Sequence, residues 1–196
     1  MDEHETEAIG GYELVAAHYR GKYCGVVWQL EEGGTKKQKI ESLEGVSIIE
    51  VLELLRDRVS ARLLARATSA EGSTPDIDAI ASSFRKIAPR LSSAQIQMLK
   101  AHYSAPDRRC SATELAAAAG WRTYPPANLH YGKVGWWLYG EHPTVLPRDR
   151  ATGRFIYTFM LADGVRKENE DWIWTMHPHI AEALRASGVL TLNMAA

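Results

Sequence analysis

The sequence from Leu91 to Trp137 constrains the fold of this chain most, because it predicts three short helices separated by turns. A pair of serines predicts the start of a first helix that runs through His102. Ser111 and Glu114 have the spacing of a capping box, in which the hydroxyl accepts from a backbone amide and the carboxylate reaches back. This box predicts a second, alanine-rich helix, and two adjacent prolines predict a third helix over about 127–139.

A β-hairpin is expected after the third helix, because two apolar runs, 154–161 and 171–176, flank a polar stretch. A last helix is expected over about 178–186. A helix, a turn, a small-residue helix, a third helix and a hairpin follow one another in the order of a winged helix. In that design the third helix enters the major groove of DNA, with its N-terminal residues nearest the base edges.

Positive charge is concentrated in the centre of the chain, although the whole chain has a net charge of only −1. Residues 85–154 hold eleven lysines and arginines against four acidic residues, a net charge of +7. Residues 1–84 carry a net charge of −6, and the part from residue 155 onward carries −2. A basic segment between two acidic ones favours a protein that binds nucleic acid, because phosphates attract clustered lysine and arginine.

The polar residues at the start of the third helix are the candidates for reading base edges. Asparagine can pair with both N6 and N7 of adenine, whereas arginine and lysine suit guanine or phosphate. Two arginines before the second helix suit phosphates, and the hairpin tip suits the DNA backbone or the minor groove. The predicted contacts with double-stranded DNA are Arg108, Arg109, Arg122, Thr123, Tyr124, Asn128, Tyr131, Lys133, Arg166 and Lys167.

Apolar side chains surround the third helix and predict that most of it is buried. They are Leu129, Val134, Trp136, Trp137 and Leu138. Gly132 and Gly135 are poor helix formers, and they predict a close approach of another backbone or of a phosphate. Only the N-terminal turn of this helix is therefore expected to be free to read bases.

Five of the six tryptophans lie after residue 120 and allow two interpretations. They are Trp121, Trp136, Trp137, Trp172 and Trp174. They either pack the core, as tryptophan commonly does, or form a pocket in which an unpaired or modified base stacks. Both interpretations stay open from the sequence.

The N-terminal part predicts a separate small domain, residues 1–70, joined by the polar segment 68–75 to a second domain, residues 76–196. The expected elements are a loose acidic leader at 1–10, strands at 12–19, 22–30 and 36–43, and a capped helix at 47–66. The fold class is therefore α+β: a small antiparallel sheet with a long helix, followed by a winged helix-turn-helix-like domain. The exposed edges of so small a sheet predict that residues 12–67 form a homodimer or bind a protein partner.

Nothing in the sequence predicts a catalytic site, a metal site or a cofactor. His177 and His179 lie two residues apart, but no third ligand is near them in the sequence. No apolar run approaches the roughly 20 residues of a membrane span, and two cysteines cannot build a disulfide framework. We therefore expect a non-catalytic, cytoplasmic DNA-binding protein. The alternatives are a protein-interaction module with a structural trihelical core, and a small nuclease or base-processing enzyme with an unrecognised site.

A resemblance to one type of sequence rests on four parts of the chain. They are Leu91–Gln95 with Ala101–Tyr103, Ala112–Ala116, Ala127–Gly135, and Trp172–Pro178 with Ala181–Leu184. Over residues 91–187 they resemble an uncharacterised bacterial winged-helix-like module associated with HNH-type endonucleases. The resemblance implies a role near DNA, as a regulator or a recognition subunit in restriction-modification or phage defence. It transfers no catalytic residue, because the chain has no nuclease motif.

Overall fold

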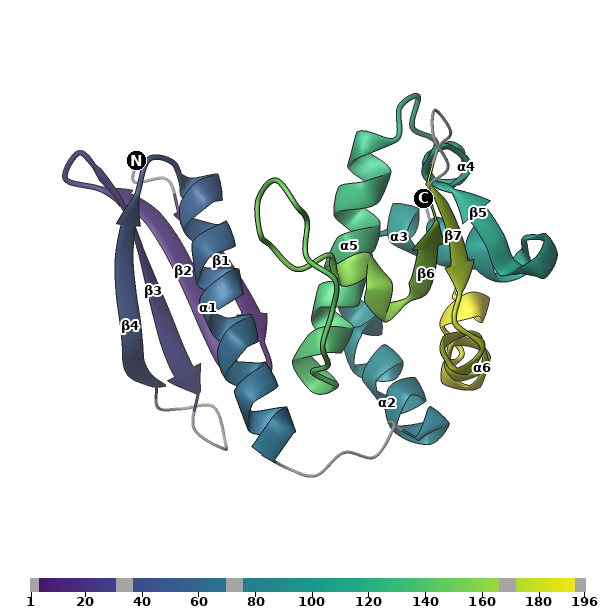
Figure 1. The fold of residues 1–196 in the computed structure, drawn as a ribbon, viewed down its shortest axis with the longest axis horizontal. Coiled ribbons are helices and arrows are strands. Elements are labelled where there is room, and N and C mark those ends of the chain that lie inside the picture. The colour runs from purple at the N-terminus through teal and green to yellow at the C-terminus, as the bar shows by residue number, and fades with distance from the viewer. Residues whose placement is uncertain (1–3, 31–36, 70–75, 166–171, 193–196) are drawn as a thin grey trace. The chain divides into compact units, whose positions relative to one another are not determined.

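The computed structural model describes residues 4–30, 37–69, 76–165 and 172–192. The chain divides into two compact units, Met1–Gly72 and Ser73–Ala196 (Figure 1). Both units combine helices with antiparallel strands, so the fold class is α+β, as predicted. Within these described ranges, no helix combines the length and the apolar character needed to cross a membrane.

The first unit is a four-stranded antiparallel sheet with one long helix packed on a face of it (Figure 1). Its elements are β1 (His4–Ile9), β2 (Tyr12–Tyr19), β3 (Lys22–Leu30), β4 (Lys37–Gly45) and α1 (Ile48–Ser69). The strands lie side by side in chain order. Leu14 and Val27 of the sheet and Leu55 and Val59 of α1 are fully buried, so the core of this unit lies between the sheet and the helix.

The expectation of a loose leader is wrong for residues 4–9, which form β1 and pair with β2. Gly10 and Gly11 have φ of 51° and 79°, which a two-residue hairpin turn requires and glycine adopts without steric cost. β1 also buries Glu7, whose carboxylate accepts two hydrogen bonds from Arg56 of α1, at 2.8 and 2.6 Å. This ion pair therefore stabilises β1, a strand that its acidic sequence does not predict.

α1 is positioned by its first turn and by contact with β3. The Ser47 hydroxyl accepts from the amide of Glu50 at 3.1 Å, as predicted. The Glu50 carboxylate accepts from the amide of Val46, one residue earlier than a capping box requires. Gly25 of β3 lets the helix approach, because a Cβ there would lie 2.9 Å from the side chain of Leu55.

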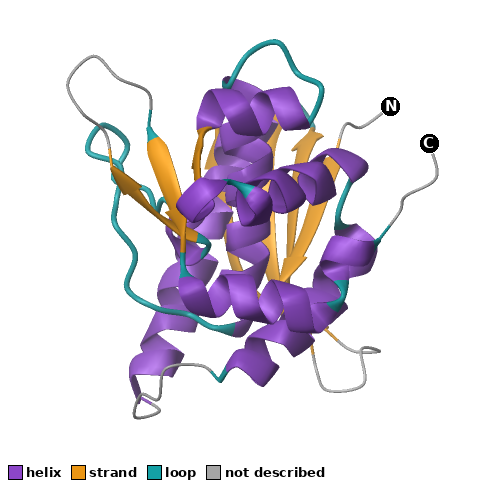
Figure 2. Ribbon diagram, turned by 90° about the vertical axis from the view of Figure 1, so that its right-hand side faces the viewer, coloured by secondary structure: helices purple, strands orange, loops and turns teal. Residues whose placement is uncertain are grey.

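The second unit is mostly helical, with a three-stranded antiparallel sheet in which β6 and β7 form a hairpin (Figures 1 and 2). Its helices are α2 (Ile77–Ile87), α3 (Ser93–Ser104), α4 (Ala112–Ala118), α5 (Pro125–Glu141) and α6 (Pro178–Ser187). Its strands are β5 (Arg109–Ser111), β6 (Ala162–Val165) and β7 (Ile173–Met176). Short 3-10 turns are η1 (Ala88–Arg90), η2 (Pro106–Arg108), η3 (Tyr157–Met160) and η4 (Val189–Thr191). β7 lies between β5 and β6, so the strand before α4 pairs with the end of the later hairpin.

The expectation of a strand over residues 154–161 is wrong, since this run is loop and η3 and β6 begins only at Ala162. The rings of Phe155 and Tyr157 lie 5.9 and 5.5 Å from the ring of Tyr139 in α5. The apolar run therefore covers a helix instead of pairing with a strand. A periodic pattern does not distinguish these two uses of buried apolar side chains.

Candidate nucleic-acid interface

Local hydrogen bonds fix both the start of α4 and the turn that leads from α4 into α5. The Ser111 hydroxyl accepts from the Glu114 amide at 3.1 Å, and the Glu114 carboxylate accepts from the Ser111 amide at 2.7 Å, so the capping box is confirmed. Hydrogen bonds from the Ser111 amide and hydroxyl to the Glu114 carboxylate hold the pKa of Glu114 below its ordinary value. Gly120 ends α4 with a φ of 77°, and the Trp121 amide donates to the Ala116 carbonyl at 2.8 Å. The chain thus enters α5 from a turn that its own backbone closes.

α5 is buried along most of its length, as its apolar residues predicted. Tyr131, Val134 and Leu138 lie in the core. Gly135 lies so close to η3 that a Cβ there would overlap the carbonyl oxygen of Tyr157. Five exposed residues just before α5 and in its first turns are here called the α5 tip: Arg122, Thr123, Tyr124, Asn128 and Leu129. The α5 tip is therefore the part of this helix that can meet a large ligand such as DNA.

Leu129 belongs to the α5 tip, although its apolar side chain suggested burial. The residue is 66% exposed. Its position on the helix is the signal that identifies it, because it lies one turn before the half-exposed Lys133 and on a different side from the buried Val134 and Leu138. An exposed apolar side chain beside Asn128 can contact the methyl group of thymine.

Tyr131, a predicted DNA contact, lies in the core and does not belong to the α5 tip. The residue is 1% exposed, and burial raises the pKa of its hydroxyl. Its hydroxyl lies 2.6 Å from Nδ1 of His102, and Nε2 of His102 donates to the carbonyl of Trp174 at 3.0 Å. Nδ1 of a neutral His102 therefore accepts from Tyr131, and burial lowers the pKa of His102. This network joins α3, α5 and β7, so Tyr131 has a structural role.

Arg108 and Arg109 differ in exposure. Asp107 and Arg108 both have positive φ, 52° and 54°, which is uncommon for residues other than glycine. Arg108 is half-buried, with its guanidinium 5.7 Å from the centre of the Tyr103 ring. Arg109 is exposed at the start of β5, three residues before α4. Arg109 is therefore the more accessible of the two for a phosphate.

The other cations predicted to contact DNA are Lys133, Arg166 and Lys167. Lys133 is half-buried, with its amine 5.7 Å from the ring of Trp137, and the Arg90 guanidinium lies 4.8 Å from that ring. Lys133 thus sits beside the α5 tip and not in it. Arg166 and Lys167 fall outside the described residues.

The aromatic residues of the second unit mostly pack its core. Trp136, Trp137, Tyr139 and Trp174 are buried. The rings of Trp172 and Trp174 are stacked, with centres 5.3 Å apart and an angle of 13° between their planes. Core packing thus accounts for these buried rings, whereas Tyr124 at the α5 tip is 51% exposed and can contact nucleic acid.

The two histidines after β7 stack on each other, and one of them bonds to the backbone. Their rings, His177 and His179, are stacked at 5.2 Å, and Nε2 of His177 donates to the Phe159 carbonyl at 3.0 Å. Across the described ranges, no three His, Cys, Asp or Glu residues gather as a metal site would require.

Burial raises the pKa of the Cys110 thiol to about 11, so it stays protonated at neutral pH.

Comparison of the chain with protein-family models, with curated proteins and with solved structures gives no match.

Proposed function

We propose that residues 76–196 form a winged-helix-like unit that binds double-stranded DNA, and that the chain acts as a non-catalytic regulator or recognition subunit. The order α3, β5, α4, α5, β6 and β7 supports this proposal. In it, α4 and α5 are the helix-turn-helix, α5 is the recognition helix, and β6 and β7 flank the wing. This proposal implies that the protein acts in the cytoplasm, where bacterial DNA lies.

Exposure of the α5 tip on an otherwise buried helix is the observation that carries the proposal. Because core residues fix α5, the tip presents its side chains on a rigid support. These side chains include an amide, a guanidinium, hydroxyls and an apolar group, which are the groups that read base edges and thymine methyls. Exposed Arg109 adds a contact for phosphate, which positions a protein on DNA without reading its sequence.

Asn128→Ala and Arg109→Ala should weaken DNA binding in different ways. Loss of the Asn128 amide should cost about 1–3 kcal/mol on a site enriched from random DNA, and little on random DNA. Loss of Arg109 should weaken binding to both DNAs alike and flatten the salt dependence by about one unit of slope. Fluorescence anisotropy with the two duplexes measures both effects.

Gln97→Ala is the matched control for Asn128→Ala, because it removes an exposed amide from α3. It should leave binding to both duplexes unchanged. Equal losses for the Asn128 and Arg109 variants on enriched and random DNA would reject base reading by α5.

The resemblance over residues 91–187 favours a setting in restriction-modification or phage defence. A non-catalytic chain serves there by bringing a partner enzyme to a DNA site. The α5 tip would select the site, and the partner would supply the chemistry.

The face of the first sheet opposite α1 supports a second candidate function, homodimerisation or protein binding through residues 12–67. Side chains alternate along strands, so Val15, Val26 and Trp28 point away from α1, on the opposite face from Leu14. Val15 and Val26 lie directly opposite each other on β2 and β3, and both are partly exposed. An apolar group of this kind is suited to contact with another protein.

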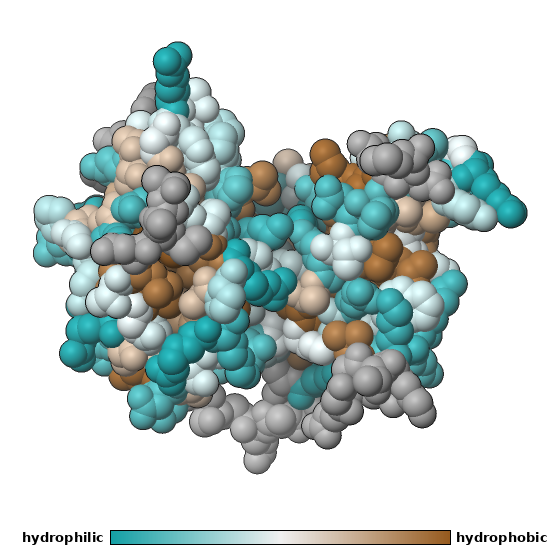
Figure 3. All heavy atoms as spheres, turned by 180° about the vertical axis from the view of Figure 1, so that it is seen from behind, coloured by the Kyte–Doolittle hydropathy of each residue, from teal (hydrophilic) through white to brown (hydrophobic). Residues whose placement is uncertain are grey.

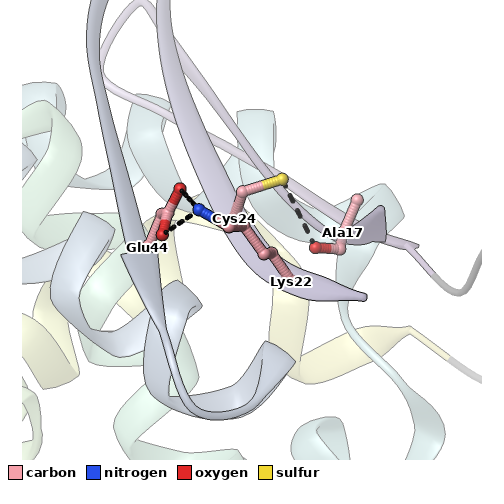
Figure 4. A network of polar contacts seen from close by, with 4 residues as sticks. All are labelled: Ala17, Lys22, Cys24 and Glu44. Carbon is pink, nitrogen blue, oxygen red and sulfur yellow. Dashed lines mark hydrogen bonds and ion pairs between the residues drawn. The ribbon is translucent and has the colours of Figure 1, made fainter. Parts of the chain in front are cut away.

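Polar contacts border this face (Figure 4). Lys22 donates to the carboxylate of Glu44 at 2.9 Å, and the Cys24 thiol lies 3.6 Å from the Ala17 carbonyl oxygen. Figure 3 shows hydrophobic surface in separate areas among hydrophilic side chains. An apolar centre with a charged border is typical of a protein interface.

Val26→Glu should convert a homodimer to a monomer, because a carboxylate in an apolar interface loses its hydration without gaining a partner. Ala61→Glu is the control, since Ala61 is exposed on α1 and not on the sheet. Sedimentation of the full-length proteins measures the effect. A monomeric wild-type chain at high micromolar concentration, or a dimer that survives Val26→Glu, would exclude a dimer through this face.

A further inference from the structure

Residues 147–156, between α5 and β6, form a tight loop here called the arginine loop. Figure 1 draws the segment between α5 and β6 in green, as a long loop beside α5. Arg148 and Phe155 form an isolated antiparallel bridge at its base. The Ile156 amide donates to the Pro147 carbonyl at 3.0 Å, and the Asp149 amide donates to the carbonyl of Arg154 at 2.8 Å. Two backbone hydrogen bonds therefore join the beginning of the loop to its end.

Asp149 organises the tip of the arginine loop. Its Oδ1 accepts from the amides of Ala151 and Thr152, at 3.1 and 2.8 Å, and from the Thr152 hydroxyl at 2.9 Å. Gly153 completes the turn with a φ of 72°, and its amide donates to the Asp149 carbonyl at 2.8 Å. One carboxylate oxygen thus accepts from three donors and orders the loop tip, although Asp149 itself is exposed.

The loop exposes two arginines, Arg148 and Arg150. The Arg148 guanidinium stacks 3.9 Å from the centre of the Phe155 ring and donates to the Gly153 carbonyl at 2.7 Å. Arg150 is exposed at the tip, and the structure gives it no hydrogen bond or ion pair with the residues it describes. Arg154 is half-buried. The loop thus holds three arginines and one aspartate, and Arg150 is the exposed arginine whose charge takes no part in the described contacts of the loop.

The arginine loop is anchored on the C-terminal half of α5. The rings of Phe155 and Tyr157 pack on the ring of Tyr139 in α5. The backbone of Tyr157 lies against Gly135, one turn earlier on the same helix. Tyr139 lies eleven residues after Asn128, which is roughly 16 Å along the helix axis. The major groove is about 12 Å wide. If α5 enters the groove with Asn128 at the bases and its axis leads outward, a loop anchored at this distance comes beside the DNA backbone.

We propose that the arginine loop is a second DNA contact, which binds the phosphate backbone flanking the groove that α5 enters. This inference rests on the proposed DNA binding by α5. The loop binds phosphate through arginines, which suit it by charge and by their forked donors. Because the loop is already ordered, little conformational entropy is lost on binding.

Arg150→Gln in the full-length chain should weaken binding to a random duplex of about three helical turns. Loss of one phosphate contact should make the slope of log K against log salt less steep by about one unit, and should weaken binding roughly eightfold at 0.1 M salt. Arg185→Gln is the control, because it removes an equal charge from an exposed position on α6. It should leave the slope unchanged.

Asp149 variants separate an ordered contact from simple attraction to positive charge. Asp149→Ala makes the loop more positive but removes the acceptor that fixes its tip, so binding should weaken. Asp149→Asn makes the same change of charge and keeps an oxygen acceptor, so binding should equal or exceed that of the wild type. Tighter binding by both variants would mean that net charge alone matters, and would overturn the ordered contact.

The outcomes for the loop and for α5 are distinguishable. If the wild type binds DNA and Arg150→Gln matches Arg185→Gln, the arginine loop is not a DNA contact. If the wild type does not bind DNA, the proposed function is lost and the inference is lost with it. A selective loss in Arg150→Gln and Asp149→Ala supports the proposal.

Discussion

Gly135→Ala should prevent the second unit from folding stably, whereas Gly132→Ala should leave it as stable as the wild type or slightly more stable. A Cβ on Gly135 would overlap the carbonyl oxygen of Tyr157 and lie 2.8 Å from its carbonyl carbon. These are backbone atoms of η3, which a side-chain rotation cannot move aside. Overpacking of this kind costs about 3 kcal/mol or more.

Gly132 is the matched control, because it lies one turn earlier on the same helix. A Cβ there would lie 3.6 Å from the Thr158 hydroxyl oxygen, which is an ordinary contact. Replacing a helical glycine with alanine stabilises a helix by about 1 kcal/mol. Tryptophan fluorescence during urea unfolding reports on this unit, since five of the six tryptophans lie in it. Equal stability of the two variants would contradict the packing of η3 on α5.

Acidification below pH 6.5 should destabilise the second unit through His102. Burial lowers the pKa of His102 below its ordinary value of 6.5. The unfolded chain then binds a proton at a higher pH than the folded chain does, so the free energy of unfolding falls as pH falls from about 6.5 to the folded pKa. Above pH 6.5 the contribution is fully present. The loss is at most about 1.4 kcal/mol for each pH unit in that window.

His102→Gln tests this assignment. The variant should be less stable at neutral pH by about 1–3 kcal/mol, because Tyr131 or the Trp174 carbonyl loses its partner. Its stability should fall less steeply between pH 6.5 and pH 5. Urea unfolding at a series of pH values measures both quantities. The remaining slope has the same sign, since burial also lowers the pKa of His142, the Ser83-bonded histidine at the end of α5. Equal slopes for variant and wild type would exclude His102 as a source of the acid sensitivity.

Capped helices could be predicted from the sequence, because a cap is a contact between residues three apart. Ser92 accepts from the amide of Gln95 at 3.3 Å, and the Ser111 and Glu114 pair closes as its spacing predicted. The basic centre of the chain could be predicted as well, because net charge depends on composition alone. Local rules therefore suffice for α3 and α4.

Elements that depend on distant partners could not be predicted in the same way. β1 is acidic, and it is stabilised by an ion pair between Glu7 and Arg56, 49 residues apart. The run 154–161 has the pattern of a strand, but it covers α5. Such uses of a sequence depend on tertiary contacts, which periodicity does not contain.

The residues of the candidate site also divide into those that the sequence predicts correctly and those that depend on tertiary contacts. Asn128 and Arg122 are exposed, as the expected start of a recognition helix requires. Tyr131 follows Asn128 by three residues but turns into the core to meet His102, and Leu129 turns outward. The packing of α3 and η3 around α5 decides which of these side chains are exposed.

Binding of the full-length chain to a labelled random duplex, measured by fluorescence anisotropy as salt is raised, decides whether the protein binds DNA. At low salt we expect saturable binding in the micromolar range, with log K falling linearly as log salt increases. Residues 1–72 alone should show no binding. Absence of binding at tens of micromolar protein, or binding that does not respond to salt, would contradict DNA binding by the second unit.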